Sequence, residues 1–168
     1  MGSRKPPLLI DAAAGAIAGA LGTWLMSPAQ SLASKLQGAS DQKREQQVSL
    51  DKNATELMAI RLGRLIKKDL QGDALKKAGL AVHYGYGALW GMAFALLSRG
   101  ARRLPFAAGL ALGASLWLLG DEIAVPALRL ASGPKKYPVS SHLKALAAHL
   151  AYGAGVEGSL RLARRAGA

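Results

Sequence analysis

Four stretches of this sequence are long and apolar enough to cross a membrane as α-helices. They cover about residues 8–26, 78–98, 104–128 and 139–160. Each is close to the ~20 residues that a helix needs to cross the hydrocarbon layer. Ser27-Pro28 should end the first helix, because proline lacks the backbone donor that a helix interior requires. The pattern predicts an all-α polytopic membrane protein, in which residues 1–168 form a single membrane domain with a bundle of four transmembrane helices.

A polar stretch at about residues 35–77 separates the first two apolar segments. Its first half, Gly38 to Ser49, is rich in Gln and Ser and is predicted to be a loop. In its second half apolar and basic residues mix at helical spacing: Leu57, Ile60, Leu65 and Ile66 lie among Arg61, Arg64, Lys67 and Lys68. This spacing predicts a basic amphipathic helix, which either lies on the membrane surface or is a solvated helix packed on its neighbours. We therefore expect a basic, partly helical loop between the first two membrane helices.

Pairs of glycines four residues apart recur in three of the apolar segments. They are Gly15 and Gly19, Gly87 and Gly91, and Gly109 and Gly113; Ala154 and Gly158 continue the pattern in the fourth. Small residues at this spacing let two helix backbones approach closely in lipid. The glycines predict close helix packing, either within one chain or between copies.

The first apolar segment has a second interpretation. Its basic start, Arg4-Lys5, and Ser31-Leu32-Ala33 near a possible cleavage site are also features of a secretory signal peptide. Asp11, however, lies inside the apolar run. We therefore expect a membrane helix that is not removed by cleavage.

The distribution of charge along the chain indicates which kind of partner the protein binds. The formal net charge is +12, but the Lys and Arg residues lie mostly between and after the apolar segments, where they can face anionic lipid headgroups. No basic face recurs with stacking aromatics, so the lipid bilayer and not nucleic acid is the expected partner. The absence of cysteine excludes disulfides and thiolate metal sites. The distribution of Lys and Arg leaves the orientation open, because long loops report it poorly.

Ionisable residues inside the apolar segments are the candidate functional residues, because a charge or an imidazole at membrane depth is costly. A rise of ~1.5 Å per residue gives each one a depth along its helix. Four of them fall in one polar layer near the long loop: His83, Asp121, Glu122 and His142. Asp11 and Glu157 fall in a thinner layer near the other side, and His149 alone falls near the bilayer centre. These last three are the further members of a candidate proton relay.

Several of these residues also have a purely structural interpretation. Glu157 is spaced i,i+4 from Arg161, which favours a simple ion pair. The adjacent Asp121-Glu122 can pair with Lys144, with His142 or with a backbone group of the 129–138 loop. The histidines can serve as hydrogen-bonding groups between helices.

A metal site on the last helix alone is excluded by distance. His142 and His149 lie seven residues apart, which is about 10 Å along the helix axis. One metal cannot bind both, since zinc–nitrogen bonds are ~2.0–2.1 Å long. A metal site would need His83, His142 and the acidic pair from different helices. No phosphate-binding loop, nucleophile elbow or HExxH motif is present.

Several short motifs resemble the YagU-like family of uncharacterised bacterial inner-membrane proteins. They are the stretch 120–128 (GDEIAVPAL), Tyr137-Pro138, His142 and the stretch 149–153 (HLAYG), with Ala18-Gly19 to Met26, His83-Tyr84-Gly85 and Gly87 extending the likeness. Residues 36–75 match poorly. The resemblance implies a small multi-pass protein of the bacterial inner membrane, and it carries no reaction with it. It singles out six motif positions without giving them roles: Asp121, Glu122, Pro126, His142, His149 and Glu157.

These observations predict a structural or accessory membrane subunit that packs through its GxxxG faces, within a larger membrane complex or a homo-oligomer. The alternative is a proton- or ion-handling protein that uses the His, Asp and Glu residues, since imidazole titrates near neutral pH. A metal- or haem-binding protein is a third, less favoured interpretation. No cofactor, metal or catalytic residue is predicted.

Overall fold

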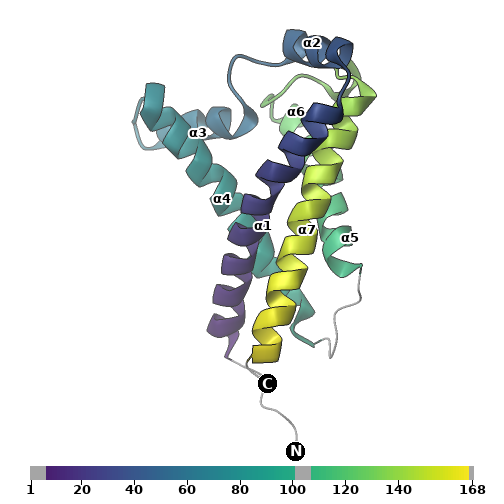
Figure 1. Ribbon diagram of the computed structural model, residues 1–168. Coiled ribbons are helices and arrows are strands. Elements are labelled where there is room, and N and C mark those ends of the chain that lie inside the picture. Colours follow the sequence, from purple (N-terminus) through teal and green to yellow (C-terminus); the bar gives the residue numbers. More distant parts are fainter. Residues whose placement is uncertain (1–6, 101–106, 167–168) are drawn as a thin grey trace, which may run out of the picture.

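The computed structural model describes residues 7–100 and 107–166, and every regular element in these ranges is helical. In chain order (Figure 1) the elements are α1 (Leu8–Leu36), α2 (Ala39–Val48), α3 (Ala54–Leu65), α4 (Gly72–Leu97), the 3₁₀ turn η1 (Ser98–Gly100), α5 (Ala108–Leu116), the π-helix η2 (Trp117–Ala124), α6 (Val125–Ala127), the 3₁₀ turn η3 (Pro134–Lys136) and α7 (Val139–Ala166). Three stretches are long and apolar enough to cross a membrane: Leu8–Leu36, Gly72–Leu97 and Ala108–Ala127. The expected all-α, membrane-type fold class is confirmed, but α7 does not reach the apolarity of these three spans.

The long helices pack around α7. Figure 1 shows α1 and α7 side by side, with α5 on the other side of α7. Helix α4 packs on α1, and its first turns diverge from the bundle together with α3, which packs on them. Helix α2 lies across the end of the bundle where α7 begins. The bundle is therefore tight at one end and spread apart at the other.

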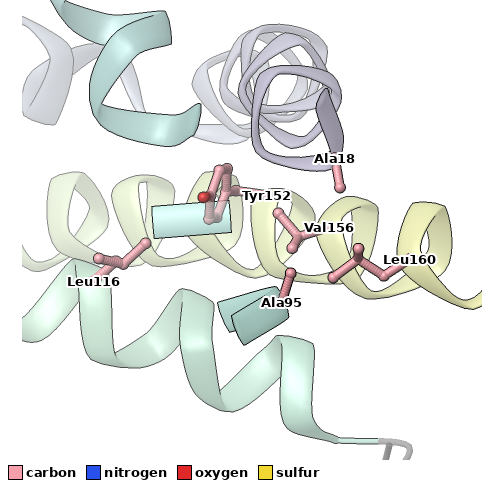
Figure 2. Close-up of a cluster of buried hydrophobic side chains, with 6 residues drawn as sticks. All are labelled: Ala18, Ala95, Leu116, Tyr152, Val156 and Leu160. Atoms are coloured by element: carbon pink, nitrogen blue, oxygen red, sulfur yellow. The ribbon is translucent and has the colours of Figure 1, made fainter. Parts of the chain in front are cut away.

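The buried core is small and centres on α7. It consists of Ala18, Ala95, Leu116, Tyr152, Val156 and Leu160 (Figure 2), and the last three belong to α7. Many large apolar side chains lie instead on the outside of the helices, such as Leu9, which is 83% exposed, and Leu97, which is 87% exposed. Extended apolar surfaces of this kind mark contact with a membrane or a partner.

The glycine pairs of α1 and α4 meet each other. A Cβ atom on Gly15 would lie 2.6 Å from the carbonyl oxygen of Gly91, and one on Gly91 would lie 2.5 Å from the Cα atom of Gly19. A Cβ atom on Gly19 or Gly87 would also collide with the facing helix. Since real Cβ atoms essentially never come this close, both GxxxG motifs are occupied by contact within the chain.

The glycines of α5 meet α7 in the same way. A Cβ atom on Gly109 would lie 2.7 Å from the Cβ atom of Glu157, and one on Gly113 would lie 2.8 Å from the carbonyl carbon of His149. Gly153 of α7 faces Gly109 in return. A Cβ atom on Gly158 would meet nothing within 4 Å in the described part of the chain, so the Ala154–Gly158 pair does not mark a comparable contact.

Two local expectations near the first loop are wrong. Helix α1 does not end at Ser27-Pro28 but continues to Leu36 with Pro28 inside it. Proline is tolerated within membrane helices where neighbouring helices satisfy the freed backbone groups, and α1 packs against both α4 and α7. The stretch from Gly38 to Ser49 is also not a loop, because Ala39–Val48 forms α2. Its Gln, Glu, Lys and Arg residues are good helix formers.

The third apolar segment is not one regular helix. Residues 104–106 lie outside the described residues, α5 begins at Ala108, and the chain changes to π-helix over Trp117–Ala124. The hydrogen bond from the Val125 N–H to the Gly120 carbonyl shows the wider i→i+5 spacing. Helix α4 also begins six residues before the expected position, at Gly72.

Candidate functional site

The ionisable residues predicted from the sequence form three groups along the bundle. Asp11 and Glu157 lie at the end where α1 begins and α7 ends, each with its own partner. Glu122 and His142 form a pair at the opposite end. Between these ends, His83, Asp121 and His149 line one cavity. The expected single layer of four residues is thus divided, and His149 does not lie alone.

The carboxylates of Asp11 and Glu157, at the first end of the bundle, both bind partners. Asp11 of α1 binds Arg99, whose Nε lies 2.6 Å from the Asp11 carboxylate. Glu157 of α7 binds Arg161 through one oxygen, and its other oxygen accepts a 2.8 Å hydrogen bond from the Gly109 N–H. Because α5 has no side-chain cap of its own, this contact makes Glu157 the cap of a neighbouring helix. These contacts support the structural interpretation of both residues.

His142 is held on both sides of its ring. Its Nδ1 lies 2.6 Å from a carboxylate oxygen of Glu122, and its Nε2 lies 3.1 Å from the carbonyl oxygen of Pro134. A carbonyl can only accept, so Nε2 carries a proton, and a second proton lies between Nδ1 and Glu122. Both ring nitrogens of His142 therefore have a partner, one in Glu122 and the other in the turn η3.

A polar cluster that the sequence did not predict ties α2 to α7. The Lys144 ammonium donates to both oxygens of Glu45, each at 2.7 Å, and Ser141 donates to Glu45 at 2.6 Å. Gln37 donates to Glu45 at 2.8 Å. Burial alone would raise the pKa of Glu45, but the hydrogen bonds from Lys144, Ser141 and Gln37 outweigh it and lower that pKa below its usual value. Of the alternative partners expected for the acidic pair of the third segment, Lys144 is therefore wrong, whereas the pairing of Glu122 with His142 is confirmed.

The π-helix η2 sets the direction of the two neighbouring carboxylates. Asp121 and Glu122 both lie within it, and they reach different histidines of α7. Glu122 pairs with His142, whereas Asp121 lies beside His149, about 10 Å further along α7. π-helical segments are rare and frequently occur at functional sites.

A cavity of about 720 Å³ lies where the helices spread apart. Its walls come from α1, α3, α4, α5, α6, α7 and η2. Apolar side chains supply much of the lining, including Met26, Leu80, Val82, Leu116, Val125 and Leu128. The ionisable groups within it are His83, Asp121 and His149 in the middle of the helices, and Glu56 and Lys76 from α3 and the start of α4.

The histidines and the carboxylate in this cavity are less well partnered than the other polar groups. His149 donates from Nδ1 to the Ala145 carbonyl at 2.9 Å, and the same nitrogen is 3.6 Å from the Asp121 carboxylate, which is too long for a hydrogen bond. The Asp121 side chain is 41% exposed. Within residues 7–100 and 107–166, no hydrogen bond reaches Asp121, the Nε2 of His149 or the ring nitrogens of His83. This trio is the candidate site.

The cross-helix metal site does not form among the described residues. His83 lines the cavity, while His142 is occupied by Glu122 and Pro134. No group of three or more His, Cys, Asp or Glu side chains in this part of the chain is placed to hold a metal ion.

Comparison of the chain with protein-family models, curated proteins and solved structures finds no match. The likeness to the YagU-like family therefore stays a prediction based on short motifs. The site must be interpreted from its own geometry.

Sequence reasoning missed two kinds of residue around the site. Gln37 and Glu45 lie at or inside the stretch predicted to be a loop, where no periodicity marks them. Tyr152 lies at the base of the cavity and donates a 2.7 Å hydrogen bond to the Gly87 carbonyl. A tyrosine within an otherwise small and apolar stretch, 151–156, is the signal that could have identified it.

Proposed function

We propose that this is a four-span integral protein of the bacterial inner membrane that binds a small amphipathic molecule in the cavity between its helices. The proposal rests on a contrast between polar atoms that have a hydrogen-bond or ion-pair partner and polar atoms that have none. Asp11, Glu122, His142 and Glu157 all have close partners. In the cavity, by contrast, Asp121 and the ring nitrogens of His83 have no hydrogen bond within the described residues, and His149 uses only its Nδ1. A charge or an imidazole at membrane depth is costly, so half-buried groups of this kind that lack partners require an explanation.

The position of α7 supports a fourth span. This helix has 28 residues, which correspond to roughly 42 Å, enough to cross the hydrocarbon layer. It lies between α1 and α5, and its polar residues Ser141, Tyr152 and Glu157 are buried. A helix surrounded by other helices can be less apolar than one that faces lipid, because its polar side chains meet protein.

The size and lining of the cavity support the binding of a small molecule. Ligand pockets commonly have volumes of about 300–1,000 Å³ and are mainly apolar with a few convergent polar groups. The cavity has about 720 Å³, and His83, Asp121 and His149 are among the polar groups that line it. Since its walls belong to helices that are apolar on the outside, a ligand dissolved in the membrane is the natural occupant.

Proton handling is the second candidate, favoured by the two His–carboxylate pairs on α7. Beyond His149, the next acidic or basic residue of α7 is Glu157, about 12 Å further along the axis. Glu157 is occupied by Arg161 and Gly109. A relay along α7 would thus reach about halfway, which favours ligand binding over proton transfer across the membrane.

An accessory role in a larger complex stays a prediction. The GxxxG faces that suggested it are filled by contacts between α1 and α4 and between α5 and α7. A partner or a second copy would have to bind the outer apolar surface, for example the face of α1 that exposes Ile17, Leu21 and Trp24.

A cavity-filling substitution tests the proposed binding function. A Cβ atom on Gly120 would meet just one side-chain atom, the Tyr86 hydroxyl oxygen, at 3.5 Å, so Gly120→Leu fits the backbone and fills part of the cavity. Gly85→Leu is the matched control, since a Cβ atom there meets nothing within 4 Å in the described residues. Saturable binding of decanol to protein in lipid nanodiscs, corrected for empty nanodiscs, should be strong in the wild type and in Gly85→Leu and weak in Gly120→Leu. Equal binding by all three proteins, or no saturable binding, would contradict the proposal.

A further inference from the structure

The hydrogen bond of His149 to its own helix determines what its ring offers to the cavity. The Ala145 carbonyl can only accept, so the Nδ1 atom 2.9 Å away carries the proton. In the neutral ring Nε2 then holds a lone pair and is an acceptor. His83 lines the same cavity, and its ring nitrogens have no hydrogen-bond partner among the described residues. His149 therefore presents an acceptor to any bound molecule.

Asp121 adds a second and stronger acceptor. An ionised carboxylate only accepts hydrogen bonds, and a charge within the membrane is costly until a partner neutralises it. The Nδ1 atom of His149, 3.6 Å away, already donates to the Ala145 carbonyl and is too far for a hydrogen bond to Asp121. The cavity thus offers a carboxylate and imidazole nitrogens to an occupant that brings hydrogen-bond donors.

The other charges on the cavity wall do not change this balance. Lys76, the cation among the lining residues, lies 3.5 Å from Asp73, and both side chains are largely exposed. Glu56 belongs to the capping box of α3, where it accepts from the Asn53 N–H. Among the described residues that line the cavity, Asp121 is the carboxylate that accepts no hydrogen bond.

We propose that the cavity selects lipid-soluble amines. The ammonium group binds Asp121 and donates to Nε2 of His149 and to His83, while the hydrocarbon part occupies the apolar lining. A primary ammonium has three donors and one positive charge, which match the acceptors and the negative charge of the site. A metal ion does not fit the same residues, since no metal-holding group of three forms in the described chain. This inference rests on the binding function proposed above and names the head group of its ligand.

Three decyl compounds that differ in their head group test the selection. Decylamine, decanol and decanoate are titrated into nanodiscs of zwitterionic lipid that contain the protein, and binding to empty nanodiscs is subtracted. Wild-type protein should bind decylamine on the order of tenfold more tightly than decanol, because a hydrogen bond to a charged partner is worth about 1.5–3 kcal/mol. Decanoate should bind most weakly, since its carboxylate faces that of Asp121.

Two variants of neighbouring carboxylates locate the effect. Asp121→Asn removes the charge and keeps the shape, so the affinities for decylamine and decanol should become nearly equal. Glu122→Gln is the matched control, because Glu122 binds His142 and does not line the cavity. It should keep the preference for the amine. Far-UV circular dichroism before titration shows that each variant is folded, and decanol binding shows that its cavity is intact.

The outcomes separate this inference from the function on which it rests. Saturable decanol binding without a preference for decylamine would overturn the selection for amines and leave the binding function standing. An amine preference that persists in Asp121→Asn would also overturn it. The absence of saturable binding by all three compounds would overturn both.

Discussion

Glu157 should stabilise the fold by capping a helix to which it does not belong. Its carboxylate is 5% exposed, and one of its oxygens accepts from the Gly109 N–H at 2.8 Å. Gly109 is in the first turn of α5, whose backbone N–H groups have no partners within the helix. The other oxygen binds Arg161 one turn further along α7. Two uncharged variants, one of which keeps a hydrogen-bond acceptor, can separate these contacts.

The expected losses follow from what each variant leaves behind. Glu157→Ala removes both contacts and leaves a buried N–H without a partner, which should lower the free energy of unfolding by about 3 kcal/mol. Glu157→Gln keeps an amide oxygen that can accept from Gly109 and loses the charge that favours both Arg161 and a helix N-terminus. Its loss should be about 1 kcal/mol. The intermediate size is the signature of capping.

Reversible unfolding in mixed micelles, followed by far-UV circular dichroism, measures these differences. Equal losses for Gln and Ala would mean that charge alone matters and that the Gly109 contact contributes nothing. Losses below about 0.5 kcal/mol in both variants would place Glu157 among ordinary surface residues and refute the capping argument.

Two further predictions use the same kind of paired comparison. Gly19→Leu forces α1 away from Gly87 of α4 and should lower the free energy of unfolding by about 2–3 kcal/mol. Gly85→Leu is the control, because a Cβ atom there meets nothing within 4 Å in the described residues, and it should be neutral or stabilising. Equal effects of the two substitutions would refute the contact between the helices. The lowered pKa of Glu45 means that its contribution is fully present above the usual value of 4.5 and is lost as the pH falls through its lower folded pKa. Protection of the α2 amides from hydrogen exchange, taken relative to the intrinsic exchange rate at each pH, should therefore fall below pH 4.5, and Lys144→Met should move this transition to higher pH. Protection that is unaffected by either change would contradict the docking of α2 through Glu45.

The membrane character of the fold was readable from the sequence because it depends on local composition. Apolar runs near Leu8–Leu36 and Gly72–Leu97 are visible in any window of suitable length. The glycine spacing also identified the positions where the backbones of α1 and α4 approach. Which helices meet is a property of the whole bundle, so the choice between contacts within the chain and contacts between copies needed the structure.

Other features could not be predicted because distant residues determine them. Helix α2 has no buried residue of its own and is tied to the bundle by Glu45, through Lys144, about a hundred positions away in the chain. The π-helix η2 changes the directions of Asp121 and Glu122, so depth along an ideal helix placed them in one layer when they reach different histidines. The depth estimate assumed the 3.6-residue period of an ideal α-helix, and that period gives no sign of a change to π-helix.

The polarity of α7 follows from its central position and also explains why the candidate site stands out. A helix that neighbours cover can carry Ser141, Tyr152 and Glu157, because each of these meets protein and not lipid. A polar group without a partner on α7 or on a facing helix costs free energy, so packing should give each such group a hydrogen-bond or ion-pair partner, as it does for His142 and Glu157. His149 and Asp121 remain open towards a cavity that the spreading of α4 maintains. A carboxylate that accepts no hydrogen bond at membrane depth, beside an open imidazole nitrogen in the same cavity, is best explained by a ligand that binds both.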